Sequence, residues 1–214
     1  MKIKMIDLYF DKLKNSINKL GGSEDRFKKY NTIIQRYSET WRYYHTLFHL
    51  KDVFENIDFI ISKMDLAKKD VAVIYLAAAY HDIFYDPYSK INEKRSIQIM
   101  KQELSKCEID NKYISLIGSM ILDTAYGSNR LGGTLSDILS DADLSIFASD
   151  KDKFNEYENN IRLEYNHIPD DKYVLARQDV MNMFLVNDIY HTQIAYDAWH
   201  DNALDNLKKY TGKL

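Results

Sequence analysis

The chain has 214 residues, 29 of them basic and 32 acidic, with a formal net charge of −3 and a hydrophobic fraction of 45%. This length predicts one large domain or at most two small ones, and the balanced charge argues against an electrostatic nucleic-acid binder or a basic membrane-surface protein. The single cysteine, Cys107, excludes an intrachain disulfide. The longest apolar run, Val71 to Tyr80, is about half of a membrane span, and residues 1–7 are charged too evenly for a secretory signal. We therefore expect a soluble, cytoplasmic protein.

The composition favours an all-α fold, because only 7 glycines and 2 prolines are present and β-sandwiches need many turns. Apolar residues recur at helical spacing through most of the chain. Ser23 is the expected N-cap of the second helix. We predict helices over about 6–20, 23–37, 45–64, 70–83, 92–107 and 111–124, a loop over 126–134, and three or four further helices within 136–210.

Two histidines, His45 and His49, stand four residues apart. On a helix this spacing places both imidazoles on one face, where they could bind one metal ion. An isolated pair of histidines at this spacing is more often two half-exposed side chains near a helix start than a metal-binding pair. Thr46 follows His45, so the segment lacks the glutamate of an HExxH zinc protease.

The doublet His81-Asp82 closes a run of small and apolar residues. Burying an ionisable pair at the end of a core helix costs free energy unless a partner offsets it, and a metal ion would be such a partner. The alternative is a doublet that caps the helix or bonds to nearby backbone.

A pair of carboxylates, Asp141 and Asp143, forms the third candidate segment. Residues two apart point to different faces of a helix, so only one of them is expected to face a shared site. The alternative is a helix N-cap, for which Asp is a preferred residue.

Together, a His, a His-Asp doublet and an Asp on separate helices resemble the HD superfamily of metal-dependent phosphohydrolases. His49 is preferred over His45 because Val53 follows it by four residues, as an apolar residue does in many of these proteins. Asp143 is preferred over Asp141 because the ligand usually follows Ala in an Ala-Asp pair. The superfamily pattern H…HD…D then maps to His49, His81, Asp82 and Asp143.

The resemblance is closest to a subgroup of small, mostly uncharacterised proteins, and it spans about residues 41–207. Relatives often carry a histidine where this chain has Gly127, which argues against a dinuclear site and leaves room for reduced activity. Each shared motif alone is weak, but the ordered set is specific. The shared segments are Tyr44–His49, His81–Asp86, Asn92–Ser96, Asp141–Leu144, Ile161–Tyr165 and Ile189–Thr192.

The resemblance implies a single HD-type helical domain over residues 1–214, with about eight to ten helices. It also implies hydrolysis of a phosphomonoester or phosphoanhydride, for example in a nucleotide, with one divalent ion of Mn, Fe, Co, Ni, Zn or Mg. Two imidazoles and two carboxylates suit such an ion. The ion would lower the pKa of a water molecule and offset charge on a phosphoryl oxygen.

Two residues are candidates for catalysis. Asp82 would both bind the ion and orient the attacking water. Glu93 is the candidate base or orienting group, and it could equally be a first-turn glutamate that is favourable to the helix dipole.

Four residues are candidates for substrate contacts. Arg42 could clamp a phosphate with its planar fork, or it could be solvated. His45 could bond a leaving-group oxygen, or it could be a histidine satisfied by other partners near the pocket. Asn92 belongs to the same set, as does Tyr190, which is more often a core residue.

Two other classes of function stay open. One is a metal-binding or ligand-binding module that keeps the pocket but turns over little substrate. The other is an all-α interaction protein that uses its 17 tyrosines as a binding face. Metal analysis of the purified protein separates the interaction protein from the phosphohydrolase and the metal-binding module. A phosphatase screen separates the phosphohydrolase from the metal-binding module.

Overall fold

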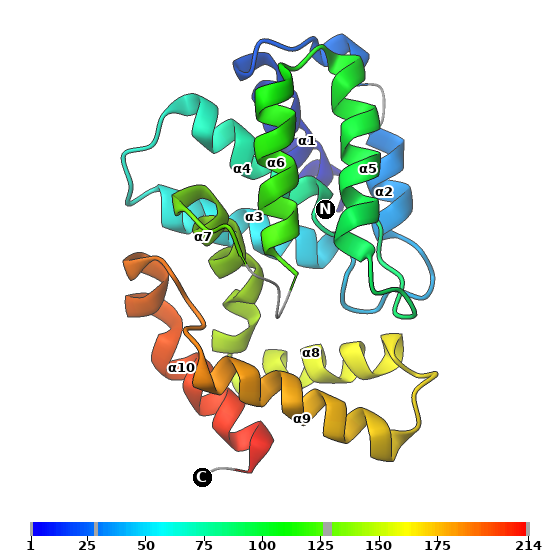
Figure 1. The fold of residues 1–214 in the computed structure, drawn as a ribbon, viewed down its shortest axis with the longest axis vertical. Coiled ribbons are helices and arrows are strands. Elements are labelled where there is room, and N and C mark those ends of the chain that lie inside the picture. The colour runs from blue at the N-terminus through cyan, green and yellow to red at the C-terminus, as the bar shows by residue number, and fades with distance from the viewer. Residues whose placement is uncertain (1, 28–29, 126–129, 213–214) are drawn as a thin grey trace.

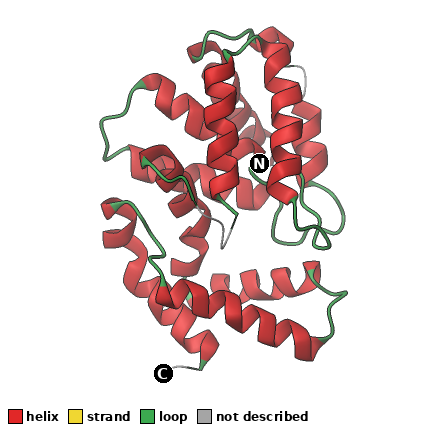
Figure 2. Cartoon of the chain, viewed as in Figure 1, coloured by secondary structure: helices red, strands yellow, loops and turns green. Residues whose placement is uncertain are grey.

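The computed structural model describes residues 2–27, 30–125 and 130–212, and in this part of the chain helices are joined by loops, with no strand (Figure 2). The predicted all-α class is therefore confirmed. Within the described residues, no helix is both long and apolar enough to cross a membrane. The α-helices are α1 (Lys2–Lys19), α2 (Tyr30–Tyr37), α3 (Leu47–Ile61), α4 (Lys68–Tyr80), α5 (Asn92–Leu104), α6 (Asn111–Asp123), α7 (Thr134–Asp143), α8 (Lys151–Glu164), α9 (Asp170–Val186) and α10 (Gln193–Thr211). Short 3₁₀ turns are η1 (Glu24–Arg26), η2 (Ser105–Cys107) and η3 (Leu144–Ala148).

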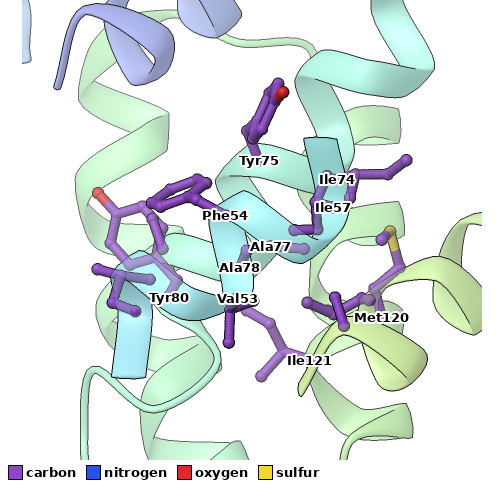
Figure 3. Close-up of a cluster of buried hydrophobic side chains, with 14 of the residues drawn as sticks. Val53, Phe54, Ile57, Ile74, Tyr75, Ala77, Ala78, Tyr80, Met120 and Ile121 are labelled. Carbon is purple, nitrogen blue, oxygen red and sulfur yellow. The ribbon is translucent and has the colours of Figure 1, made fainter. Parts of the chain in front are cut away.

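Helix α4 lies at the centre of the core, where it contacts α1, α3, α6 and α7. Every residue from Ala72 to Tyr80 is buried, which explains why this helix is apolar on all sides. Figure 3 shows side chains of α3 and α6 packed against it, among them Phe54 and Met120. Fully burying one such side chain contributes about 1.5–3 kcal/mol. The end of α4 is therefore a firmly held platform for the residues that follow it.

The remaining helices form two groups at opposite ends of the molecule (Figure 1). Helices α5 and α6 pack side by side at one end, and α9 packs on α10 at the other. Helix α7 contacts both α3 and α4, and η3 continues from it to contact α8 and α10. The chain after α7 therefore joins the core to the C-terminal helices.

Two helix boundaries differ from the sequence prediction near the histidines. Helix α3 begins at Leu47, because the Thr46 side chain accepts a hydrogen bond from Phe48 N (3.3 Å) and caps it. His45 therefore lies before the helix, and the prediction of two histidines on one helical face was wrong. Helix α4 ends at Tyr80, so the doublet follows the helix instead of lying within it.

The second predicted helix is also interrupted. Ser23 precedes the 3₁₀ turn η1 but makes no side-chain cap, and its N–H bonds to Cys107 O (2.8 Å). At Gly22 an added Cβ would lie 2.7 Å from that same carbonyl oxygen, so only glycine fits this approach. Phe27 then leaves the helical conformation (φ −75°, ψ 61°), so the turn ends there and α2 begins at Tyr30.

Candidate metal centre

Three ligand-type side chains meet where α3, α4 and α7 come together. His49 lies in the first turn of α3, His81 follows α4, and Asp143 is the last residue of α7. His49 Nε2 is 3.3 Å from His81 Nε2 and 3.2 Å from Asp143 Oδ1, and His81 Nε2 is 3.4 Å from the same oxygen. Residues far apart in sequence therefore present their ligand atoms to one point, and this group could hold a metal ion.

The carboxylate of Asp82 borders this group of three. Its Oδ2 lies 3.1 Å from His81 Nε2 and 3.6 Å from His49 Nε2. Asp82 lines a cavity together with His81 and Asp143. The structure thus brings all four residues of the H…HD…D pattern together; we call His49, His81, Asp82 and Asp143 the cluster.

The spacing within the cluster fits ligands of a single ion. Two ligand atoms about 2.1 Å from one ion, at about 90–109° to each other, lie about 3.0–3.4 Å apart. The three separations among His49, His81 and Asp143 fall in this range. The two imidazole nitrogens and the carboxylate oxygens also form a donor set that suits first-row divalent metals.

Hydrogen bonding fixes which nitrogen of His81 faces the cluster. Its Nδ1 lies 2.8 Å from Ala78 O, and a carbonyl only accepts, so Nδ1 carries the hydrogen. The neutral ring therefore presents the lone pair of Nε2 to the cluster. Orientation of a ligating histidine by a backbone carbonyl is typical of metal sites.

The buried cluster carries strong electrostatic coupling. Burial alone would lower the pKa of His49, but hydrogen bonds to Asp143 and Asp82 raise it above its usual value. Burial would also lower the pKa of His81, yet the charge of Asp82 and the hydrogen bonds to both carboxylates raise it far more. Burial would raise the pKa values of Asp82 and Asp143, and the two histidines lower both instead. Protons and a divalent cation therefore compete for this cluster.

Arg42 holds the backbone of the doublet. Its guanidinium donates to Asp82 O (2.7 Å), Ile83 O (3.1 Å) and His45 O (3.2 Å), and it pairs with Glu39 (3.0 Å). The side chain is fully buried and is not among the residues that line the cavity. This placement favours a positioning role for Arg42 over the predicted phosphate clamp, because four of its five N–H donors are already used and the side chain does not reach the cavity.

His45 lies beside the cluster on a segment that Glu164 holds. Glu164 Oε1 accepts from the backbone N–H groups of Tyr43, Tyr44 and His45 (2.8–2.9 Å), and its Oε2 lies 2.6 Å from His45 Nδ1. Burial would raise the pKa of Glu164, but the charge and the hydrogen bonds of His45, with the backbone donors, lower it. His45 also stacks on Tyr85 at 3.8 Å between ring centroids, and its Nε2 lies 3.9 Å from Asp82 Oδ2.

Asn92 and Ser96 hold the loop after the doublet. The Asn92 side chain exchanges two hydrogen bonds with the backbone of Asp86 (3.1 and 3.2 Å), and Ser96 Oγ does the same with Phe84 (3.1 and 3.2 Å). Glu93, between them, lines the cavity, and burial raises its pKa. Asn92 therefore positions the loop, while Glu93 is free to face a ligand.

Tyr190 and Asp141 lie away from the cavity. Tyr190 is buried and donates to Leu144 O (3.1 Å), which is the core role considered for it. Asp141 accepts from His191 N (2.8 Å), Thr192 N (2.7 Å) and Thr192 Oγ1 (2.7 Å), so it fixes the start of α10. Asp141 and Asp143, two residues apart, thus serve different parts of the fold.

Three members of the cluster, His81, Asp82 and Asp143, line a cavity of about 440 Å³. Its walls come from the loop after α4, the start of α5, the ends of α6 and α7, and one face each of α8 and α9. Lys90 lies at this cavity with an exposed side chain, and among the described residues it has no ion pair.

Sequence reasoning missed three residues of the site: Glu164, Ser96 and Lys90. The first two belong to the shared segments Ile161–Tyr165 and Asn92–Ser96, but no role was predicted for them. No local pattern marked Lys90. Gly127, the position of the expected further histidine, lies outside the described residues.

The chain was compared with protein-family models, curated proteins and solved structures. No protein-family model matches the chain, and no curated protein and no solved structure is significantly similar to it.

Proposed function

We propose that the protein is a metal-dependent phosphohydrolase of the HD type, acting on a small phosphorylated molecule. The observation that carries this proposal is the convergence of His49, His81 and Asp143, with Asp82 beside them, where His81, Asp82 and Asp143 line a cavity. A divalent cation held there would make water a stronger nucleophile near neutral pH and offset negative charge on a phosphoryl oxygen.

The charges around the cavity explain why a phosphate would need the cation. Asp82, Glu93 and Asp143 all line the cavity, and these carboxylates would repel a phosphate dianion. Arg177 also lines it but pairs with Glu158 through two hydrogen bonds (2.6 and 3.0 Å). Lys90 is exposed at the cavity and has no ion pair among the described residues, so it would attract the phosphate from the solvent side.

The proposed roles follow from these positions. Asp82 accepts a hydrogen bond from the attacking water, which orients the water oxygen toward phosphorus. The imidazolium form of His45 gives its Nε2 proton to the leaving-group oxygen as the phosphorus–oxygen bond breaks, and the proton that the attacking water loses passes to Asp82. Glu164 holds the other nitrogen of that ring and so sets its direction. Arg42 keeps Asp82 and His45 in register by binding both of their carbonyl oxygens.

The test begins with protein stripped by a chelator and reloaded separately with Mn²⁺, Co²⁺, Zn²⁺ or Mg²⁺. We expect close to one ion per chain, and release of inorganic phosphate from a panel of phosphomonoesters and phosphoanhydrides only by the loaded protein. Metal binding without phosphate release from any compound would instead support a metal-binding module. Failure to bind any of the ions would remove both interpretations.

A further inference from the structure

A second, smaller cavity also borders the cluster. Its volume is about 260 Å³, and its lining comes mainly from α3, from the end of α7 through η3, and from the start of α8. His49 lines this cavity and is not among the described residues that line the cavity of about 440 Å³. We call the larger one the main cavity and the smaller one the side cavity. The lining residues of the side cavity used below are His49, Asp52, Asp143, Ser149, Asp150 and Lys153.

The two cavities share a wall at the cluster. Tyr44, Asp143 and Ile146 line both of them. Asp143 Oδ1 is the atom that lies 3.2 Å from His49 Nε2 and 3.4 Å from His81 Nε2. Of these two histidines, His81 lines the main cavity and His49 lines the side cavity. A divalent ion held by these side chains would therefore lie at the shared wall, next to both cavities.

Charged residues give the side cavity an excess of negative charge. Asp52, Asp143 and Asp150 line it, and Lys153 is the only lysine or arginine among the described residues that do so. Lys153 pairs with Asp52 (2.6 Å). The Asp150 side chain accepts the backbone N–H of Lys153 (2.9 Å) and has no ion pair among the described residues, so it keeps its charge. Asp150 and Lys153 are exposed, and the side cavity therefore opens to solvent beside them.

The main cavity differs in the charge that it shows to solvent. Lys90 is exposed there and has no ion pair within the described part of the chain. A positive charge in this position attracts a phosphate and repels a metal cation. At the side cavity the exposed lysine is neutralised by Asp52, and Lys51, which also touches Asp52, is paired with Glu55 (2.5 Å). The exposed charges thus favour anions at the main cavity and cations at the side cavity.

The side cavity is also large enough for a hydrated ion. Six water molecules occupy about 180 Å³ at their liquid volume, which is less than the cavity's volume of about 260 Å³. Asn56 lines it, and its Nδ2 donates to Asp52 O (2.8 Å) and to Ser145 Oγ (2.7 Å). Aspartate and asparagine oxygens are groups that replace water around hard divalent cations. The size and the polar lining therefore suit the passage of such an ion.

We propose that the side cavity is the route by which a divalent cation enters and leaves the cluster, while the main cavity takes the phosphorylated substrate. Exchange of the ion then does not require the substrate or product to leave. The inference rests on the proposed function only in that the cluster binds a divalent ion.

The first test compares two partly buried serines, one at each cavity. Ser149 lines the side cavity and Ser89 lines the main cavity. Metal-free protein is mixed with Co²⁺, whose bound form absorbs visible light, and release is followed with excess chelator. Ser149→Trp should slow loading and release by about fivefold or more and leave the Kd unchanged, because a narrowed route raises one barrier for both directions. Ser89→Trp should change neither rate.

The second test uses charge, and it decides the matter if Ser149→Trp does not fold. Lys153→Met frees the carboxylate of Asp52 and should speed Co²⁺ loading by about two- to fivefold at low ionic strength. Asp52→Asn should slow loading by a similar factor, whereas damage to the fold would move both variants in the same direction. Lys90→Met is the matched control, since it makes the same change of charge at the main cavity and should leave the loading rate unchanged.

Several results would overturn the inference. They are slower loading in Ser89→Trp than in Ser149→Trp, a changed Kd with an unchanged loading rate in Ser149→Trp, an equal gain from Lys90→Met and Lys153→Met, and no binding of Co²⁺ at all.

Phosphate release separates this inference from the proposed function. Loading that depends on the side cavity, without phosphate release from any compound, would keep the route and remove the phosphohydrolase. Phosphate release by a protein whose loading rate does not respond to Ser149→Trp or Lys153→Met would keep the phosphohydrolase and remove the route.

Discussion

The cluster and the α9 side of the main cavity are built on different physical principles. In the cluster, ionisable groups are oriented by backbone hydrogen bonds, as in the bond from His81 Nδ1 to Ala78 O. On the α9 side, helical periodicity brings aromatic and aliphatic side chains to the cavity.

This difference shows which residues of the cavity need precisely placed hydrogen-bond partners. Charged groups buried in a core are costly unless their partners are well placed, so the cluster requires many fixed contacts. A wall of aromatic and aliphatic side chains depends on shape and needs few fixed polar contacts. Substitutions in the cluster should therefore have larger effects than those of exposed residues at the cavity, and the predictions below test that ranking.

The largest effect is expected from Asp143→Asn. Replacing this cluster carboxylate should lower metal affinity and phosphohydrolase activity by more than about 100-fold, because even partners outside the metal's own ligands contribute 10–100-fold. Asp141→Asn is the matched control, since Asp141 bonds the start of α10 instead. Metal analysis of both variants checks the prediction, and an equal loss in the two would show that the wrong carboxylate was chosen.

Glu164→Ala tests whether the C-terminal helices support the cluster. The change leaves three backbone N–H groups and the His45 ring without their acceptor, so we expect the free energy of unfolding to fall by about 3 kcal/mol. Glu55→Ala removes a glutamate whose side chain is 52% exposed and should cost less than about 1 kcal/mol. Chemical denaturation of both variants measures the contrast, and similar values would contradict it.

Metal binding should change the pH dependence of stability. In the metal-free protein the raised pKa values of His49 and His81 contribute stability that is complete below the unfolded imidazole pKa and lost as pH rises through the folded values. The lowered pKa values of Asp82 and Asp143 contribute stability above the unfolded carboxyl pKa that is lost as pH falls through the folded values.

A metal ion acts in the opposite direction to the histidine protons, because it needs neutral imidazoles. At a hundredfold excess over its dissociation constant it should add about 2.7 kcal/mol. The gap in melting temperature between Mn²⁺-loaded and chelated protein should therefore widen from about pH 5.5 to about pH 8.5, across the imidazole range. A gap that narrows over this range, or no gap at any pH, would contradict metal binding at the cluster.

The smallest effect is expected at Lys90. Its side chain is exposed, so its attraction for phosphate is screened by water and salt. Lys90→Ala should raise KM by about two- to fivefold at low ionic strength and leave kcat nearly unchanged. Steady-state kinetics at two salt concentrations check this, since added salt should remove the difference between the variant and the wild type.

The sequence by itself determined the features that depend on local spacing. Few turn residues and a helical apolar period predicted the all-α class, and the continuous apolar run from Val71 to Tyr80 predicted the buried helix α4. The order of His49, His81, Asp82 and Asp143 also pointed to residues that the fold brings together. These predictions work because periodicity and burial are set by residues close together in the chain.

Only the tertiary structure decided which polar groups face the cavity. Arg42 was a candidate phosphate clamp, with a solvated arginine as the alternative, but it is buried and binds the carbonyl oxygens of residues 40 and 41 positions away. Glu164 holds the His45 segment over a separation of about 120 residues. The side cavity beside the cluster can likewise be recognised only once the fold is known. The physical reason is that a hydrogen bond satisfies a side chain through whatever backbone the fold brings near it, and local spacing carries no record of that partner.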